Sequence, residues 1–166
     1  MKIVLATDGS DHSKAMVKKF ASRTFAPNSK VRIISVYERS YYLLNTAPMG
    51  VLNEYYDTAD RYSQKLAEDA VENAATILRK KNPKLSVSVA VIEGTAKSVI
   101  LQEAEKFGAD LIVVGSHGRG AVAGFLLGSV SQSVALHAID EVAERISKLG
   151  SKAIGTMEEL GKLSAQ

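Results

Sequence analysis

The sequence contains no cysteine and no tryptophan, and only three prolines. Lack of cysteine excludes disulfides, cysteine-ligated zinc and a cysteine nucleophile, and suits a reducing compartment. No apolar stretch reaches the roughly 18 residues that a membrane-spanning helix needs. The N-terminal MKIVLATDGS holds too short an apolar run for a signal peptide. We therefore expect a cytoplasmic protein without a membrane partner.

Long runs of like charge are also missing, because 21 basic and 18 acidic residues are scattered along the chain. Without a basic arm, we expect no nucleic-acid partner. A composition that is 46% hydrophobic and 23% charged is typical of a globular protein. The 166 residues suffice for one domain with a sizeable core.

Strand-like apolar segments alternate with amphipathic helical segments. The patterns predict strands at 2–7, 31–37, 86–92 and 110–114, and helices at 13–25, 52–78 and 96–107. This order predicts an α/β fold, with an open parallel sheet and helices on both faces. Among local signals, Ser10 or Asp11 is expected to cap the first helix, Thr95 to cap the third and Gly108 to end it. Tyr62 is expected on the apolar stripe of the second helix.

A glycine-rich segment follows the fourth expected strand, with helical spacing from about Ser129 to His137. Glycine lets a ligand approach the backbone, and a helix N-terminus attracts phosphate. In open parallel sheets, ligands lie beyond the carboxyl ends of the strands, where the strand order reverses. If strands one and four are neighbours, residues 7–10 and 115–128 face one crevice. From the residues alone, a phosphate site and an ordinary surface loop both remain open.

Three segments of the chain resemble the universal stress protein family. They are KIVLATDGSDHS, DLIVVGSHGRG and GFLLGSVSQSVALHA, and the resemblance spans roughly residues 1–138. The nucleotide-binding branch of that family carries G-x2-G-x9-G-[ST], which Gly115, Gly118, Gly128 and Ser129 match. The resemblance implies a Rossmann-like fold of the adenine nucleotide alpha hydrolase type.

The resemblance also implies a site for ATP or another adenine nucleotide. Ala6 and Thr7 would border the adenine, and the backbone of Val36 would contact it. Asp8 would approach the ribose or the phosphates, the latter with Mg²⁺ or Mn²⁺ between them, because a carboxylate repels phosphate. Backbone groups that would hold the phosphates belong to Gly115, Ser116, His117, Gly118, Arg119, Gly128, Ser129, Val130 and Ser131.

Structural roles compete with these assignments. Asp8 also suits a turn or a helix cap, Ser129 and Ser131 suit caps, and His117 and Arg119 suit a solvated loop. Only Asp8 and Glu93 could serve as a catalytic base, and neither is specific. We therefore expect a stress or signalling module that binds nucleotide with little or no hydrolysis.

The C-terminal segment departs from the family pattern. Similar proteins end with an apolar strand after the position of His137, whereas residues 139–146 have helical spacing and mixed charge. We expect a nucleotide-binding domain at 1–138 and a helical extension at 139–166, with helix in place of the last strand. The usual strand-mediated homodimer is therefore in doubt.

Two other functions remain open. An adenylating enzyme of the related fold needs a glycine-rich phosphate loop after the first strand, where this chain has Thr7-Asp8-Gly9-Ser10-Asp11. A ligand-free interaction protein would lack the glycine motif, which is intact here.

Overall fold

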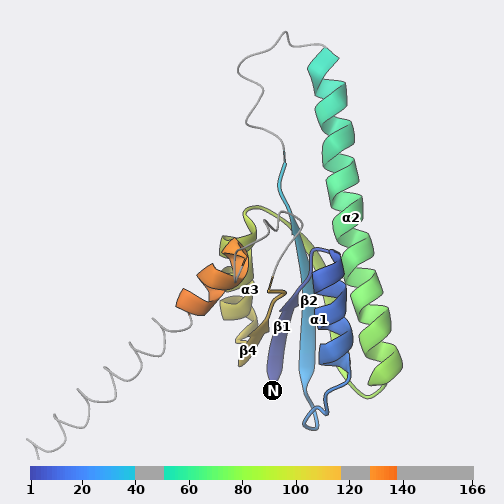
Figure 1. Cartoon of the computed structure of the whole chain (residues 1–166), viewed down its shortest axis with the longest axis vertical. Helices are drawn as coiled ribbons and strands as arrows, with labels where there is room; N and C mark the ends of the chain where they lie inside the picture. Colours follow the sequence, from blue (N-terminus) through green and yellow to red (C-terminus); the bar gives the residue numbers. More distant parts are fainter. Residues whose placement is uncertain (40–50, 117–127, 138–166) are drawn as a thin grey trace, which may run out of the picture.

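The computed structural model describes residues 1–39, 51–116 and 128–137. It contains a parallel sheet in the order β3-β2-β1-β4, which confirms the predicted α/β class (Figure 1). The strands are β1 (Lys2–Ala6), β2 (Lys30–Tyr37), β3 (Ser86–Glu93) and β4 (Leu111–Val113). The helices are α1 (Asp11–Ala21), α2 (Val51–Lys81) and α3 (Ala96–Phe107), and residues 129–137 form a further helix.

β1 is the central strand, since it pairs in parallel with β2 on one side and β4 on the other. Ile3, Val4 and Leu5 are fully buried. Because successive side chains point to opposite faces, a strand covered on both faces must be apolar at every position. This explains why β1 is a continuous apolar run rather than an alternating one.

Helices cover both faces of the sheet, as predicted (Figure 1). On one face, Ile3, Leu5 and Ile33 pack with buried residues of α1 and α2, among them Phe20 and Leu78. The opposite face carries a second core around Val4, Ala6 and Ile34. α3 contributes Ile100 and Ala104 to it, and helix 129–137 contributes Val134. Helix 129–137 is therefore anchored on the sheet beside α3.

Two of the three predicted helix signals are confirmed. Ser10 occupies the N-cap of α1, where its side chain accepts from the Ser13 amide at 3.3 Å. Gly108 ends α3 in the left-handed conformation at φ 62°, which costs glycine little. Thr95 lies at the N-cap of α3, but its side chain makes no capping hydrogen bond. The expected side-chain cap at Thr95 is therefore wrong, and only its backbone carbonyl bonds the first turn.

The apolar stripe of α2 is buried only along the part that faces the sheet. Ala70, Ala74 and Leu78 are buried, whereas Tyr62 is 65% exposed. α2 runs well past the strands toward its N-terminal end (Figure 1). Tyr62 thus has too little of the described sheet beneath it to become buried, and its expected packing on the apolar stripe is wrong.

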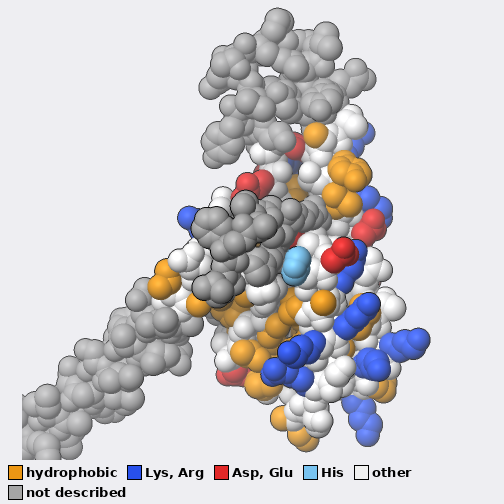
Figure 2. All heavy atoms as spheres, in the orientation of Figure 1, with side chains coloured by type: hydrophobic (Ala, Val, Ile, Leu, Met, Phe, Trp, Pro, Cys, Tyr) orange, Lys and Arg blue, Asp and Glu red, His pale blue; other side chains and the backbone are white. Residues whose placement is uncertain are grey.

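Basic side chains gather at the end of the molecule where α1 and α2 finish. Lys18 and Lys19 lie in the last turn of α1, and residues 79–81 form a basic last turn in α2. Blue side chains accordingly dominate the lower right of the space-filling view (Figure 2). Cations at helix C-termini offset the partial negative charge there. This basic end of the molecule lies near the amino ends of the strands, away from their carboxyl ends.

β4 is short and lies at the edge of the described sheet, with Leu111 37% exposed. The predicted extension at 139–166 lies outside the described residues, so the proposed division at residue 138 and the replacement of the last strand stay predictions. No helix in the described ranges is long and apolar enough to cross a membrane.

Replacing Ser35 with alanine is expected to leave the fold intact and raise the free energy of unfolding by about 1 kcal/mol. The Ser35 hydroxyl on β2 is buried, and it has no hydrogen-bond partner among the described residues. Urea denaturation measures the change, with Ser88→Ala as the control because Ser88 is the exposed neighbour of Arg32 on β3. A loss of stability specific to Ser35→Ala would show that the hydroxyl is bonded after all.

Candidate functional site

The strand order places two loops at one crevice. β2 and β3 add to one side of β1, whereas β4 returns to the other side, where Leu5 pairs with Val113. The strand order therefore reverses between β1 and β4, which is where ligands bind in open parallel sheets. β1 and β4 are thus neighbours, as a shared crevice requires. The turn after β1 lies beside the residues that follow β4.

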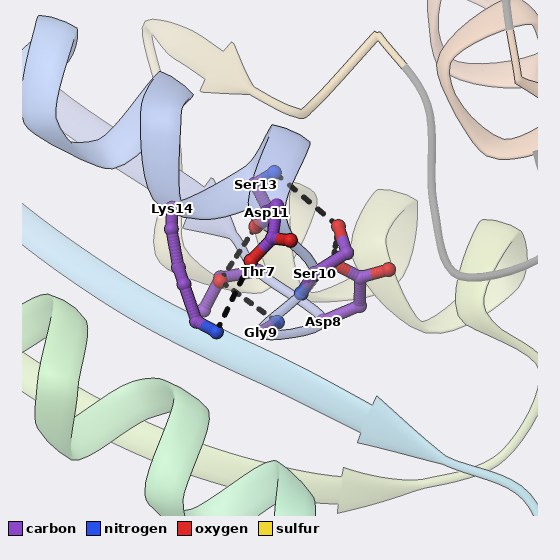
Figure 3. Close-up of polar contacts among 7 residues, drawn as sticks. All are labelled: Thr7, Asp8, Gly9, Ser10, Asp11, Ser13 and Lys14. Atoms are coloured by element: carbon purple, nitrogen blue, oxygen red, sulfur yellow. Dashed lines mark hydrogen bonds and ion pairs between the residues drawn. The ribbon is translucent and has the colours of Figure 1, made fainter.

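The turn after β1 is held by its own polar groups (Figure 3). Asp8 Oδ1 accepts from the Ser10 amide at 3.0 Å and from the Ser10 hydroxyl at 2.7 Å. Gly9 between them has φ 74°, a conformation that favours glycine. Asp8 therefore does act as a turn carboxylate, and its orientation is fixed through Ser10, which also caps α1.

Thr7 links this turn to β2 and to α1. Its amide donates to the Ile34 carbonyl at 3.0 Å, and its buried hydroxyl lies 2.7 Å from the hydroxyl of Ser13. The Thr7 side chain thus faces α1. Ala6 and Val36 belong to the core on the other face, beside α3. The three residues expected around a base therefore lie at adjacent strand ends, with Ala6 and Val36 sharing one face.

The ends of the glycine segment contact each other. The Gly128 amide donates to the Ser116 carbonyl at 2.7 Å. The Ser131 hydroxyl lies 3.1 Å from the Ser116 carbonyl and 2.8 Å from the Gly128 carbonyl. We call the Gly128 amide bond, together with the Ser131 hydroxyl shared between the two carbonyls, the loop-end contact. It fixes the spacing between the end of β4 and the start of helix 129–137.

The start of helix 129–137 offers backbone donors toward the crevice end of the sheet. Its first helical bond among the described residues runs from the Gln132 amide to the Gly128 carbonyl at 2.9 Å. The amides of residues 129–131 precede that bond and have no backbone acceptor among the residues that the structure describes, as is usual at a helix start. Since the Gly128 amide already binds Ser116, the donors that this helix start offers to a phosphate are these three.

The structure describes most of the predicted site and brings its two halves together. Ala6, Thr7, Asp8 and Val36 lie at the ends of β1 and β2, and Gly115, Ser116 and 128–131 lie around the end of β4. His117, Gly118 and Arg119 are outside the described residues. Sequence reasoning missed Ser13, because nothing in the sequence indicates that its hydroxyl meets Thr7.

A small cavity of about 150 Å³ adjoins the same turn on the opposite face of the sheet, between α1 and α2. Its wall includes Lys14, which pairs with Asp11 at 3.5 Å, and Asp69, which binds Lys65 at 2.9 Å. The hydrogen bond and the negative charge of Asp69 raise the pKa of Lys65. These charges are thus neutralised locally, on the side of the sheet away from Ala6 and Val36.

The described residues hold no group of three histidine or acidic side chains that could bind a metal ion. Asp8 offers a single carboxylate, and one of its oxygens already accepts two hydrogen bonds. The donor set at this turn therefore does not fit a metal held by protein ligands alone. A divalent ion would need phosphate oxygens and water to complete its shell.

A family model described as "Universal stress protein family" matches residues 1–142. The chain belongs to the universal stress protein family. A universal stress protein of Thermus aquaticus, found beside the QAH/OAS sulfhydrylase gene, is 29% identical over 82% of this chain and 91% of its own length. Universal stress protein Rv1636 of Mycobacterium tuberculosis is 30% identical over 82% of this chain and 89% of its own length.

Solved structures of universal stress proteins share the fold. UspA from Lactobacillus plantarum superimposes with a TM-score of 0.63, at 18% identity, over 82% of this chain and 91% of its own. A universal stress protein in complex with cAMP superimposes with a TM-score of 0.54, at 25% identity, over 81% of this chain and 87% of its own. These structures support the Rossmann-like architecture that the strand order shows.

Ser10→Ala is expected to lower the free energy of unfolding by about 1 kcal/mol, because it removes the cap of α1. Thr95→Ala is the matched control, since Thr95 also occupies an N-cap but makes no side-chain capping bond. It should cost only a few tenths of a kcal/mol. Chemical denaturation of both variants checks the difference, and equal losses would contradict the assigned role of Ser10.

Proposed function

We propose that this universal stress protein binds an adenine nucleotide, with ATP as the first candidate, in the crevice between the loops that follow β1 and β4. The observation that carries the proposal is the parallel pairing of β1 with β4. It joins a fixed acidic turn at Asp8 to a helix start whose first amides have no acceptor within the described ranges, and these two elements suit opposite ends of a nucleotide.

The phosphates are assigned to the β4 side of the crevice. The amides of Ser129, Val130 and Ser131 begin a helix, whose partial positive charge favours an anion. Gly115 and Gly128 flank this position, and Gly118 completes the family motif. Arg119 and His117, together with the Ser116 backbone, are the remaining candidates for phosphate contact.

The base and the ribose are assigned to the β1 and β2 side. Ala6 and Val36 present apolar surface on one face, and the strand ends offer backbone groups to an adenine edge. The Asp8 carboxylate accepts hydrogen bonds, so it suits ribose hydroxyls better than phosphate, which it repels. Where Asp8 approaches the phosphates, Mg²⁺ or Mn²⁺ would have to lie between them, bound mainly by phosphate and water.

Binding without appreciable hydrolysis fits the acidic groups near the crevice. Glu93 pairs with Arg39 at 3.0 Å, and Asp8 is held by Ser10. Neither carboxylate is thus arranged as a base that orients water toward a phosphoryl group. We therefore assign the chain a nucleotide-dependent stress or signalling role in the cytoplasm, rather than an enzymatic one.

The adenylating alternative is less well supported by the turn after β1. In that turn the Ser10 amide binds Asp8 and the Ser13 amide binds Ser10. The Gly9, Ser10 and Ser13 amides are therefore already bonded within the turn, and the negative charge of Asp8 disfavours a phosphate beside it. The ligand-free alternative predicts no nucleotide at all, so the binding experiment decides it.

Native mass spectrometry of the purified full chain is expected to show one adenine nucleotide per chain and to report the number of chains in the assembly. Titration with ATP, ADP, AMP and cAMP then ranks the ligands, and the cAMP complex of a similar protein makes cAMP a necessary member of this panel. Absence of binding to all four would overturn the proposal. Steady phosphate release faster than about one turnover per minute would refute the non-enzymatic assignment.

Gly128→Val is expected to weaken nucleotide binding at least about a hundredfold, or about 2.7 kcal/mol. A branched side chain at the helix start blocks close approach of phosphate to the backbone. Ala135→Val, at an exposed position of the same helix, is the matched control and should bind like the wild type. Circular dichroism confirms that both variants fold. Unchanged affinity of Gly128→Val would remove this helix start from the site.

A further inference from the structure

We propose that the Ser131 hydroxyl is a positioning group, which holds the ends of the glycine segment together before any ligand binds. The inference rests on the proposed function for its effect on nucleotide affinity, but not for its structural part. It assigns the hydroxyl to the protein's own backbone rather than to a phosphate.

The Ser131 hydroxyl already lies against two backbone carbonyls. Ser131 is 5% exposed, and its oxygen lies within hydrogen-bond distance of the Gly128 and Ser116 carbonyls. A hydroxyl has one proton to donate, and both neighbours are acceptors. That proton is therefore engaged by the backbone, which leaves the Ser131 amide as the group that can serve a phosphate.

Loss of the hydroxyl should affect positioning more than general stability. Without it, the Ser116 carbonyl still accepts from the Gly128 amide, and the Gly128 carbonyl still accepts from the Gln132 amide. Neither carbonyl is left without a donor, so the large penalty for an unsatisfied group does not arise. Helix 129–137 also keeps its anchor, since Val134 remains in the core. A variant without the hydroxyl therefore loses the contact between Ser131 and Ser116 and keeps the other contacts that hold helix 129–137.

The Ser131 hydroxyl also bears on the entropy of closing the loop. Residues 117–127 join the two ends of the loop-end contact, and bringing loop ends together costs entropy. When the Ser131 hydroxyl joins the two ends, the entropy of closing the loop is already lost on folding, before a ligand binds. Without it, a single bond from the Gly128 amide holds the ends, and part of the cost falls on ligand binding.

Amide hydrogen exchange of the full-length, ligand-free chain tests the positioning role directly. In Ser131→Ala, the Gly128 amide is expected to exchange about tenfold faster, because its bond to Ser116 opens more often. Amides of β1 and β2 should exchange as in the wild type. The thermal midpoint should match that of the control Ser133→Ala, since Ser133 is a half-buried serine of the same helix. Ser131→Thr is expected to retain slow exchange, because it keeps a hydroxyl that can donate to the Ser116 carbonyl as well as to the carbonyl three residues earlier.

Titration with ATP provides the second measurement. Ser131→Ala is expected to weaken ATP binding about tenfold, while Ser133→Ala and Ser131→Thr bind like the wild type. Unchanged Gly128 exchange in Ser131→Ala would overturn the proposal, and together with weaker ATP binding it would assign the hydroxyl to direct phosphate contact. Faster exchange throughout the domain, with a lower thermal midpoint, would assign it to general stability instead. If the wild type binds no nucleotide, the proposed function fails, while the exchange experiment still decides the role of Ser131.

Discussion

The parallel pairing of β1 with β2 and β4 is the constraint on which the rest of the structure depends. It buries β1 on both faces, so Ile3 and Leu5 serve one core while Val4 and Ala6 serve the other. It also sets the reversal of strand order at the carboxyl end of β1. The two cores and the crevice are thus consequences of one strand having two neighbours.

The polar groups around the crevice divide into those that the fold uses and those that it leaves available. Thr7, Asp8 and Ser10 satisfy one another and the start of α1, which makes that side rigid and acidic. The amides at the start of helix 129–137 have no such partners within the described ranges. An anion is therefore attracted to the β4 side and repelled from the β1 side, and this difference would orient the nucleotide of the proposed function.

Much of the fold follows from the sequence, because strand and helix periodicity are local properties. The element order, the Ser10 cap and the Gly108 stop could be predicted on that basis. The missing side-chain cap at Thr95 could not be predicted, because a capping bond depends on the side-chain rotamer. The exposure of Tyr62 could not be predicted either, because burial depends on where the sheet ends. The pairing of β1 with β4 could not be predicted either, because periodicity does not indicate which strands are neighbours.

The candidate site was predicted less completely than the fold. The family motif located Gly128 and Ser131, but their bonds to Ser116 join residues up to 15 positions apart and leave no local pattern. The same holds for the hydroxyl pair of Thr7 and Ser13. Motifs thus identify which residues surround a ligand, whereas the three-dimensional contacts determine which atoms remain to bind it.

The Lys2 amide donates to the carboxylate of Asp110, which is 108 positions away in the sequence. The ladder between β1 and β4 begins at the next pair of residues, Ile3 and Leu111. Closing so long a segment is entropically slower than pairing β1 with β2, whose connection is shorter. On these grounds β4 is expected to dock after β1 and β2 have paired, which completes this end of the sheet. A ligand that spans both strands would bind the finished molecule alone and, by mass action, would favour chains in which this last docking step has occurred.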